Sequence, residues 1–517
     1  MIKNSLKNSC FSLSILIVLV VVSFVYNYIY ISQFGPSSVH TWRQSDSASL
    51  AMNYFHNGLS FFNPKVHALI SGDSAAASEF PLTYYLAAFF YKIFGNHDYI
   101  LRIIDLLLYY IGIYFLAQLL KDYFYDNIIL AFSIILILLG MPVLAFYGYS
   151  FIPNTPALGL LFAGSYFYYR YRFKSKNSNF YPAILLFTLA GLIKPTMLIL
   201  FLSIIFTESI ATALKIYKRF NVKDLVVVFV GVVLPVAMWV FWVKHYNAIH
   251  HSGVFSTSIV PFTMLEAKDL RFALHNISTG FDGRVFQYTL MKFFFAVIVF
   301  NLIYFLRRFD LLSIFYFIFF IGTASFLLLW MKRFTVHDYY TIDIIPFYIF
   351  NIVIFFKIVS DRLKNNRLKI IFSVLTLSLG IYNVFFAGEY MKLQFLNKEN
   401  VSLNYPKSFY YNKHEFKAFL DKNNLKFNKT KIAVYPDDSP NISLYYFDCR
   451  GRTLAHDFDK FYYLKDLYND AGIEYFIVID KKVLSNKDLM KYLVRPIDSL
   501  NNEIFVYDIK NIARVSH

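Results

Sequence analysis

The stretch Ser78-Glu79-Phe-Pro-Leu-Thr-Tyr-Tyr-Leu-Ala-Ala-Phe-Phe-Tyr-Lys-Ile-Phe-Gly95 decides how the rest of the chain is arranged. Its apolar part, residues 81–94, is shorter than the roughly 20 helical residues needed to cross about 30 Å of hydrocarbon. Its many aromatic residues suit a helix that lies along the membrane surface. Whether this segment crosses the membrane determines on which side every later loop lies.

Eleven further apolar segments accompany this stretch, and we expect each to cross the membrane as a helix. No small-residue cleavage site follows the first of them, so it is interpreted as a retained span and not as a signal peptide. The predicted spans are residues 11–31, 99–119, 127–147, 155–170, 180–193, 196–213, 224–243, 286–306, 311–330, 340–357 and 369–387.

Short basic clusters between these segments indicate the orientation of the chain. If residues 81–94 crossed the membrane, the clusters at 170–176 and 362–369 would face outward, against the positive-inside rule. If residues 81–94 stay at the surface, both clusters become cytoplasmic, together with Lys215, Lys218, Arg219 and the Arg307-Arg308 pair. We therefore expect eleven spans, with the N-terminus cytoplasmic and the C-terminus extracytoplasmic, in a bacterial inner (plasma) membrane.

The composition agrees with a membrane protein. Of the 517 residues, 57% are hydrophobic and 16% are charged, whereas soluble domains carry roughly a quarter charged residues. The net charge of +17 comes from Lys and Arg clusters between apolar segments. This placement suits anionic lipid head groups as the partner, and no nucleic acid is expected.

Charge and periodicity divide the chain into two predicted domains. Residues 1–387 form a transmembrane domain, whose first extracytoplasmic loop, at about residues 33–98, carries interfacial helices. Residues 388–517 form an extracytoplasmic α/β domain. Its expected strands are residues 431–435, 443–447, 475–480 and 504–508, and its expected helices are residues 413–423 and 459–471.

The first external loop contains two acidic residues, Asp46 and Glu79, that could share the work of a group transfer. Helical spacing of apolar residues begins at Ser47, so we expect a helix to start just after Asp46, with Arg43 close by. One carboxylate would take a proton from an acceptor hydroxyl, and the other would orient the hydroxyl or bind a metal. The alternative is that Asp46 only caps its helix and that Glu79 is a first-turn residue favoured by the helix dipole.

Cationic and aromatic side chains suited to a phosphate group lie at other external positions. The segment Lys332-Arg333-Phe-Thr-Val-His337-Asp338-Tyr339-Tyr340 gathers such groups between two spans, with interfacial anchoring as the alternative. Lys194 stands at a proline hinge, where a snorkelling lysine is the alternative. Arg102, near the outer end of a span, could simply pair with Asp105 one helical turn away. The histidines of the loop at residues 244–283 match no standard zinc spacing.

Together with the opening stretch, further motifs give the chain a resemblance to a known superfamily. The opening stretch is followed by Tyr99-Ile-Leu-Arg102, and later by Pro153-Asn154-Thr155-Pro156, Lys194-Pro195, His337-Asp-Tyr-Tyr340 and Pro346. In this order, over about the first 360 residues, they resemble the GT-C glycosyltransferases, in the branch of the protein O-mannosyltransferases and the lipid A aminoarabinose transferase. The chain departs from that branch at Arg43-Gln44, where an Asp-Glu pair is common, and at Asn154, where Asp is common.

The resemblance implies the GT-C fold, an α-helical polytopic membrane protein, and an inverting sugar transfer from a polyprenyl-phosphate donor to a glycan, lipid or protein acceptor in the cell envelope. It assigns the base role to Asp46 and the second acidic role to Glu79, with a divalent metal left open. Substrate binding is then expected of Arg43, Gln44, Arg102, Lys194, Arg333, His337, Tyr339 and Tyr340. The alternatives are a transporter or a lipid or glycan flippase, and a scaffold without catalytic activity. The apolar interiors of the spans argue against transport.

Overall fold

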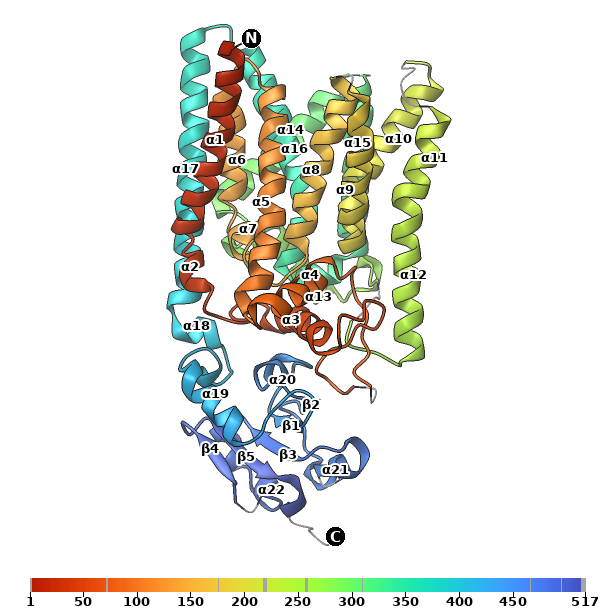
Figure 1. Ribbon diagram of the computed structural model, residues 1–517. Coiled ribbons are helices and arrows are strands. Elements are labelled where there is room, and N and C mark those ends of the chain that lie inside the picture. The colour runs from red at the N-terminus through yellow and green to blue at the C-terminus, as the bar shows by residue number, and fades with distance from the viewer. Residues whose placement is uncertain are drawn as a thin grey trace.

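The computed structural model describes residues 2–70, 73–174, 176–216, 221–255, 259–308, 310–464, 466–493 and 495–512. Figure 1 shows a bundle of long helices joined at one end to a small domain that contains the sheet. Two of the basic positions used to orient the chain, Lys218 and Arg219, lie outside the described residues.

All eleven segments predicted to span the membrane are largely helical. They correspond to α1 (Ile2–Val25) with α2 (Tyr28–Ile31), α5 (Asp98–Tyr123), α6 (Ile128–Leu139) with α7 (Pro142–Tyr147), α8 (Asn154–Phe173), α9 (Phe180–Ile193), α10 (Leu198–Ala213), α11 (Val222–Val228) with α12 (Leu234–Ile249), α14 (Tyr288–Leu306), α15 (Leu311–Leu329), α16 (Ile345–Arg362) and α17 (Asn366–Leu396). Within the described ranges, seven helices are long and apolar enough to cross a membrane by length and composition, and four apolar helices are shorter. The chain is an integral membrane protein, whereas the number of eleven crossings stays a prediction.

Helices α5 and α8 pack backbone against backbone. A Cβ atom on Gly112 would lie 2.2 Å from the carbonyl oxygen of Gly159, so only glycine permits this approach. Small residues of this kind are typical of helix pairs in membranes. The contact fixes α5, whose first turns carry Arg102. The Arg102 guanidinium donates to the backbone carbonyls of Gly35, at 2.9 Å, and of Tyr149, so the alternative interpretation, a pair with Asp105, is not the arrangement that the structure shows.

The segment between α2 and α5 contains α3 (Thr41–His56) and α4 (Leu82–Phe94), at the end of the bundle that faces the small domain (Figure 1). The start of α3 was expected just after Asp46, and this is wrong by about one and a half turns. His40 has a left-handed backbone, with φ of 53°, and the Gln44 side chain donates to the carbonyls of Ser37 and Val39. These bonds let the helix begin at Thr41, so Asp46 lies in its second turn and does not cap it.

Helix α4 buries one face and exposes the other, as expected for a helix at a membrane surface. Its buried residues, which include Tyr84 and Tyr91, pack against α3 and α5. Its exposed residues include Phe89, Ile93 and Phe94. An exposed apolar face on a short helix suits the boundary between head groups and acyl chains.

The C-terminal domain contains one five-stranded sheet with the order β2-β1-β3-β5-β4. Strands β1 (Lys431–Tyr435), β2 (Arg450–Thr453) and β3 (Tyr475–Val478) are parallel, and β5 (Ile504–Asp508) and β4 (Asp498–Leu500) run antiparallel to their neighbours. Helices α18 (Lys398–Ser402) and α19 (Lys413–Lys422) connect the sheet to α17. Ser38, just before α3, donates to the Gln394 side chain near the end of α17 at 2.9 Å.

One expected strand is wrong, since residues 443–447 fall in the short helix α20 (Ile442–Tyr446). The apolar run Ile-Ser-Leu-Tyr-Tyr fits a buried strand or a buried helical turn equally well. The turn forms because the Asp437 carboxylate accepts from the backbone N–H of Ser443 at 3.0 Å and from the Ser439 hydroxyl at 2.8 Å. Helix α20 consequently packs against α3, outside the sheet.

Candidate active site

The two acids predicted to carry chemistry lie near one another at the junction of α3, the start of α4 and the C-terminal domain. Glu79 precedes α4 and accepts hydrogen bonds from Arg43 Nη2, the Ser78 hydroxyl and the Tyr84 hydroxyl. Arg43 also donates to the Ser47 hydroxyl at 2.8 Å. Burial alone would raise the pKa of Glu79, but the charge of Arg43 and these hydrogen bonds outweigh it and lower the pKa to about 2. Glu79 is therefore an ionised partner of Arg43.

Asp46 is the second acid, and its environment has the opposite effect. Its side chain is only 3% exposed, and Oδ1 accepts a hydrogen bond from Asn441 Nδ2 at 2.8 Å. Burial raises the pKa of Asp46 to about 7, against the opposing effects of Arg43 and Asn441. A carboxylate with a pKa near neutrality is matched to the task of taking a proton from a hydroxyl group.

The pair of acids does not fit a shared divalent metal. Arg43 interacts electrostatically with both Glu79 and Asp46, so a guanidinium supplies the positive charge that a metal would bring. Hard divalent cations prefer several oxygen ligands, and the Glu79 oxygens already accept from Arg43, Ser78 and Tyr84. The suggestion that Asp46 and Glu79 hold a metal therefore receives no support from this arrangement.

A group of cationic and aromatic side chains, here called the cation cluster, lies beside the acids at the start of η6 (Asp338–Ile344). Electrostatic interactions connect Tyr339 with Arg43 and Arg333, and His337 with Arg333 and Lys194. The ring centroids of His337 and Tyr339 are 5.2 Å apart, and those of Tyr339 and Tyr340 are 5.0 Å apart. The structure thus brings Arg43, Lys194, Arg333, His337, Tyr339 and Tyr340 together.

The charges within the cation cluster suit an anionic group. Burial, with further contributions from His40, Arg333 and Lys194, lowers the pKa of His337 to about 4, so this ring is neutral at pH 7. Lys194 lies 4.5 Å from the centroid of the Tyr340 ring and 3.8 Å from Asp343 Oδ2. Cations held in place by aromatic rings and carboxylates are typical of sites that bind phosphate.

Two residues predicted to bind substrate instead donate hydrogen bonds from their side chains to backbone carbonyl groups. Arg102 is fully buried and donates to two carbonyl oxygens, as described above, and its guanidinium lies 4.4 Å from the centre of the Phe151 ring. Gln44 is also buried and donates to the carbonyls of Ser37 and Val39. Both side chains position the first loop, so a direct role in substrate binding stays a prediction for them.

Sequence reasoning missed residues that support the site from other parts of the chain. Asp338 accepts from the Tyr147 hydroxyl at 2.6 Å and lies 3.1 Å from His40 Nε2. Asp343 accepts from Asn154 at 2.7 Å and from the Thr196 hydroxyl at 2.7 Å. The positions of Asn154 and Asp338 inside conspicuous motifs could have indicated them, whereas no sequence pattern connects Asn441 with Asp46, 395 positions away.

Two of the histidines in residues 244–283 pair with single acids. His250 Nδ1 lies 2.5 Å from Asp73 Oδ2, and His275 Nε2 lies 3.5 Å from Asp282 Oδ1. In the part of the chain that the structure describes, no group of three or more His, Cys, Asp or Glu side chains is arranged to hold a metal ion. These pairs therefore serve the loop rather than a metal centre.

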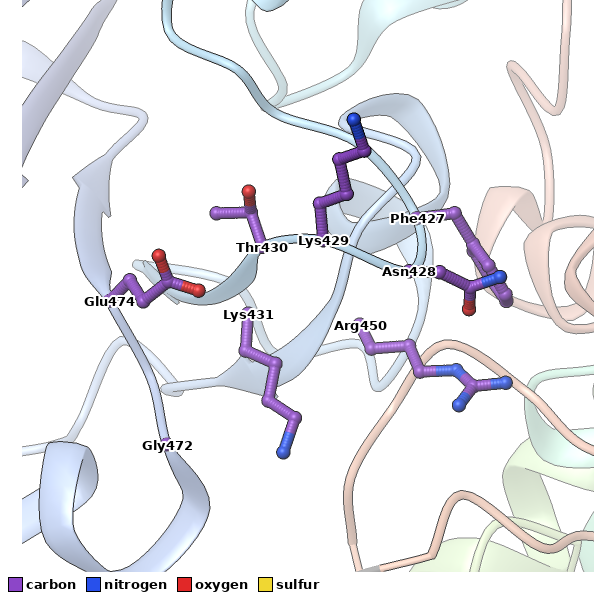
Figure 2. Close-up of a pocket in the computed structure, with 8 residues that line it drawn as sticks. All are labelled: Phe427, Asn428, Lys429, Thr430, Lys431, Arg450, Gly472 and Glu474. Atoms are coloured by element: carbon purple, nitrogen blue, oxygen red, sulfur yellow. The ribbon is translucent and has the colours of Figure 1, made fainter.

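A hollow of about 160 Å³ in the C-terminal domain lies away from the acids, at the edge of the sheet where β1 and β2 begin. In Figure 2 its side chains point in different directions: Lys429 and Lys431 diverge, and Arg450 points toward the first loop. Arg450 donates to the Asn57 side chain at 3.1 Å and lies 4.7 Å from the centre of the Phe427 ring. The hollow does not gather reactive groups, and Arg450 joins the two domains beside it.

Comparisons with known proteins agree on the architecture. Residues 77–240 match the family model described as dolichyl-phosphate-mannose-protein mannosyltransferase. ArnT from Cupriavidus metallidurans in the apo state is similar with a TM-score of 0.58 and 12% identity, over 96% of this chain and 98% of that chain. ArnT from the same organism bound to undecaprenyl phosphate gives a TM-score of 0.59 and 12% identity, over 97% of this chain and 98% of that chain. The oligosaccharyltransferase from Archaeoglobus fulgidus gives a TM-score of 0.53 with 13% identity, over 91% of this chain and 70% of that chain. No curated protein matches the chain in sequence.

Proposed function

Since the chain has the fold of the GT-C glycosyltransferases, we propose that it is an inverting glycosyltransferase of the cell envelope that uses a polyprenyl-phosphate sugar as its donor. The observation that carries the proposal is the position of Asp46, a buried carboxylate with its pKa raised to about 7, beside a cluster of cations. One group accepts a proton while the others hold a phosphate, which is what sugar transfer from a lipid phosphate requires.

The reaction is a single displacement at the anomeric carbon of the donor sugar. Asp46 takes the proton of the acceptor hydroxyl as its oxygen attacks that carbon, and the bond from the carbon to the phosphate oxygen breaks. The polyprenyl phosphate leaves with the bonding electron pair, and Arg43, Arg333 and Lys194 stabilise its developing charge. Glu79 keeps Arg43 in place through their ion pair.

Two of the similarities described above support this donor class. One solved ArnT structure is bound to undecaprenyl phosphate. The description of the matching family model names a sugar carried on dolichyl phosphate. A transporter or flippase is the second candidate. It would need charged groups in broken helices near the middle of the membrane, whereas the cation cluster lies at the end of the bundle with the small domain.

The direct test is turnover by the purified full chain in detergent, supplied with a panel of undecaprenyl-phosphate hexoses and pentoses as donors and with a lipid and glycan extract of cell envelopes as the acceptor. Release of undecaprenyl phosphate, followed by mass spectrometry, is the expected result. Passage of the same lipids across proteoliposome membranes without release would support the flippase instead.

A labelling experiment tests on which side of the membrane the first loop lies. Phe62→Cys in a Cys10→Ser background should react with an impermeant maleimide added outside whole cells, because Phe62 is an exposed residue of the first loop.

We expect kcat/KM to rise with pH and to level off above about pH 8. Asp46 must be deprotonated to act as a base, and its raised pKa of about 7 means that protons occupy it at lower pH. Below the pKa of Asp46, each further unit by which the pH falls should lower kcat/KM about tenfold, since kcat/KM reports the protonation state of the free enzyme. A pH–rate profile that is flat between pH 5 and 8 would contradict the role of Asp46.

Replacing Lys194 with Ala should raise the KM for the donor and lower kcat, so that kcat/KM falls about ten- to a hundredfold. The reason is the loss of one charge-assisted contact with the donor phosphate. Lys332→Ala is the matched control, because Lys332 directly precedes Arg333 of the cation cluster but pairs with Asp269 at the surface. Equal effects of both substitutions on KM would show that general electrostatics, and not a specific contact, binds the donor.

A further inference from the structure

The C-terminal domain places one fully buried polar side chain, Asn441, against the helix that carries Asp46. Asn441 directly precedes α20, and α20 packs on α3. Its Nδ2 atom donates to Asp46 Oδ1 at 2.8 Å, from a residue 395 positions away in the chain.

The orientation of the Asn441 amide is determined by its second partner. Its Oδ1 atom accepts from the backbone N–H of Ala68 at 3.0 Å. A backbone N–H can only donate, so the oxygen must face Ala68 and the NH2 group must face Asp46. The Ser49 hydroxyl, 3.5 Å from the same oxygen, also donates to it. The Asn441 amide therefore presents its NH2 group, and not its oxygen, to the Asp46 carboxylate.

The segment around Asn441 is held in place independently of Asp46. Asp437 accepts from the backbone of Ser443 at 3.0 Å, and the Ser439 hydroxyl accepts from the backbone N–H of Ile442 at 2.9 Å. The Tyr405 hydroxyl donates to Asp437 at 2.8 Å. This second layer of bonds fixes Asn441 before any substrate arrives, as a preorganised site requires.

We propose that Asn441 is a positioning residue of the transfer reaction, which the C-terminal domain supplies to orient the Asp46 carboxylate as a proton acceptor. The inference rests on the proposed function, because it concerns the residue assigned there as the base. It gives the C-terminal domain a part in the chemistry, through an amide that never touches the reacting atoms.

The protonation of Asp46 also depends on its other neighbours. Arg43 of the same helix favours the ionised form and Glu79 of the loop opposes it. Titratable groups of the neighbouring elements that make hydrogen bonds of their own include Tyr84 of α4, bonded to Ser47 and Glu79, Tyr445 of α20, bonded to Asp98, and His67 of the loop, bonded to Ser49. Asp105 of α5 is fully buried.

The experiment is an infrared pH titration of the purified full chain, with the Asp46→Asn protein as the spectral reference for the protonated carboxyl band of Asp46. The wild-type band should titrate near pH 7, as burial predicts. In Asn441→Ala the midpoint should move upward by about one pH unit, because one charge-assisted hydrogen bond to the ionised form is lost. Asn441→Asp keeps the size of the side chain and should move the midpoint further upward, since two adjacent carboxyl groups cannot both ionise easily.

Asn423→Ala is the matched control. Asn423 donates from the same domain to another carboxylate, that of Asp498, at 2.8 Å, so it should leave the Asp46 midpoint unchanged. A midpoint unchanged in both Asn441 variants, with only thermal stability reduced, would overturn the proposal and leave Asn441 as a packing residue. If Asn441→Ala does not fold, the isosteric Asn441→Asp protein decides alone.

Because the titration needs no donor, its outcome is separate from that of the proposed function. Absence of turnover by the wild-type protein would overturn the glycosyltransferase while leaving the hydrogen bond to be judged by the infrared midpoint. With turnover established, Asn441→Ala should lose about tenfold in kcat/KM at pH 6 and recover above pH 8. A loss that is equal at every pH would contradict a role in setting the proton acceptor.

Discussion

Asp46→Asn is expected to lower kcat by a factor of about 10² to 10⁴, which is the usual contribution of a general base. The amide has the size of the carboxylate but cannot take the proton of an acceptor hydroxyl. The substitution also removes a buried acid whose pKa is raised to about 7, so the fold should not suffer from it. The measurements are initial rates of polyprenyl-phosphate release and the thermal unfolding midpoint in detergent.

The matched control for this result is Asp73→Asn. Asp73 lies in the same loop as Asp46, but it pairs with His250, and its side chain is 42% exposed. Its substitution should leave kcat within about twofold of wild type, because exposed ion pairs contribute little. Full activity of the Asp46→Asn protein would remove Asp46 from the mechanism, whatever the control shows.

Glu79→Gln is expected to affect both stability and catalysis. Glu79 and Arg43 form an ion pair in which the side chains are 12% and 18% exposed, respectively. Removing one partner of a buried pair costs about 3–5 kcal/mol, because the other charge stays buried without compensation. Arg43 would then leave its position beside the donor phosphate. We expect a lower thermal unfolding midpoint and a loss of kcat that persists in the fraction still folded.

A second buried ion pair separates these two effects. Arg172 Nε lies 2.5 Å from Glu208 Oε1, joining α8 and α10, with side-chain exposures of 4% and 8%. Glu208→Gln should therefore lower the unfolding midpoint by a similar amount. Because this pair is not part of the site, kcat per folded molecule should be kept. Loss of kcat in both variants to the same degree would mean that Glu79 only supports the fold.

The helical bundle and α4 could be predicted because their signals are local. Apolar runs of about 20 residues and an aromatic amphipathic segment follow directly from the thickness and chemistry of a membrane. The cation cluster was also recognisable, since Arg333, His337, Tyr339 and Tyr340 follow one another closely in the sequence. Lys194 joins them through its contacts with Asp343 and Tyr340.

The errors arise where hydrogen bonds from side chains to the backbone override the pattern of apolar residues. Helix α3 begins at Thr41 because Gln44 bonds to preceding carbonyls, which no periodicity reports. Residues 443–447 form a turn of helix because Asp437 binds their backbone, although their composition suits a strand. The contact between Asn441 and Asp46 joins distant parts of the chain, so a single sequence contains no sign of it.

Helix α17 has 31 residues, or about 46 Å at 1.5 Å per residue, and so exceeds the roughly 30 Å of hydrocarbon by several turns. Its end is tied to the segment before α3 by the bond between Ser38 and Gln394. The extra turns form a rigid connection. They set the distance of the sheet domain from the membrane and its rotation about the helix axis. Adding or removing one residue in these turns would rotate the sheet domain about the helix axis by about 100°. The length of α17 therefore helps to determine the geometry of the active site.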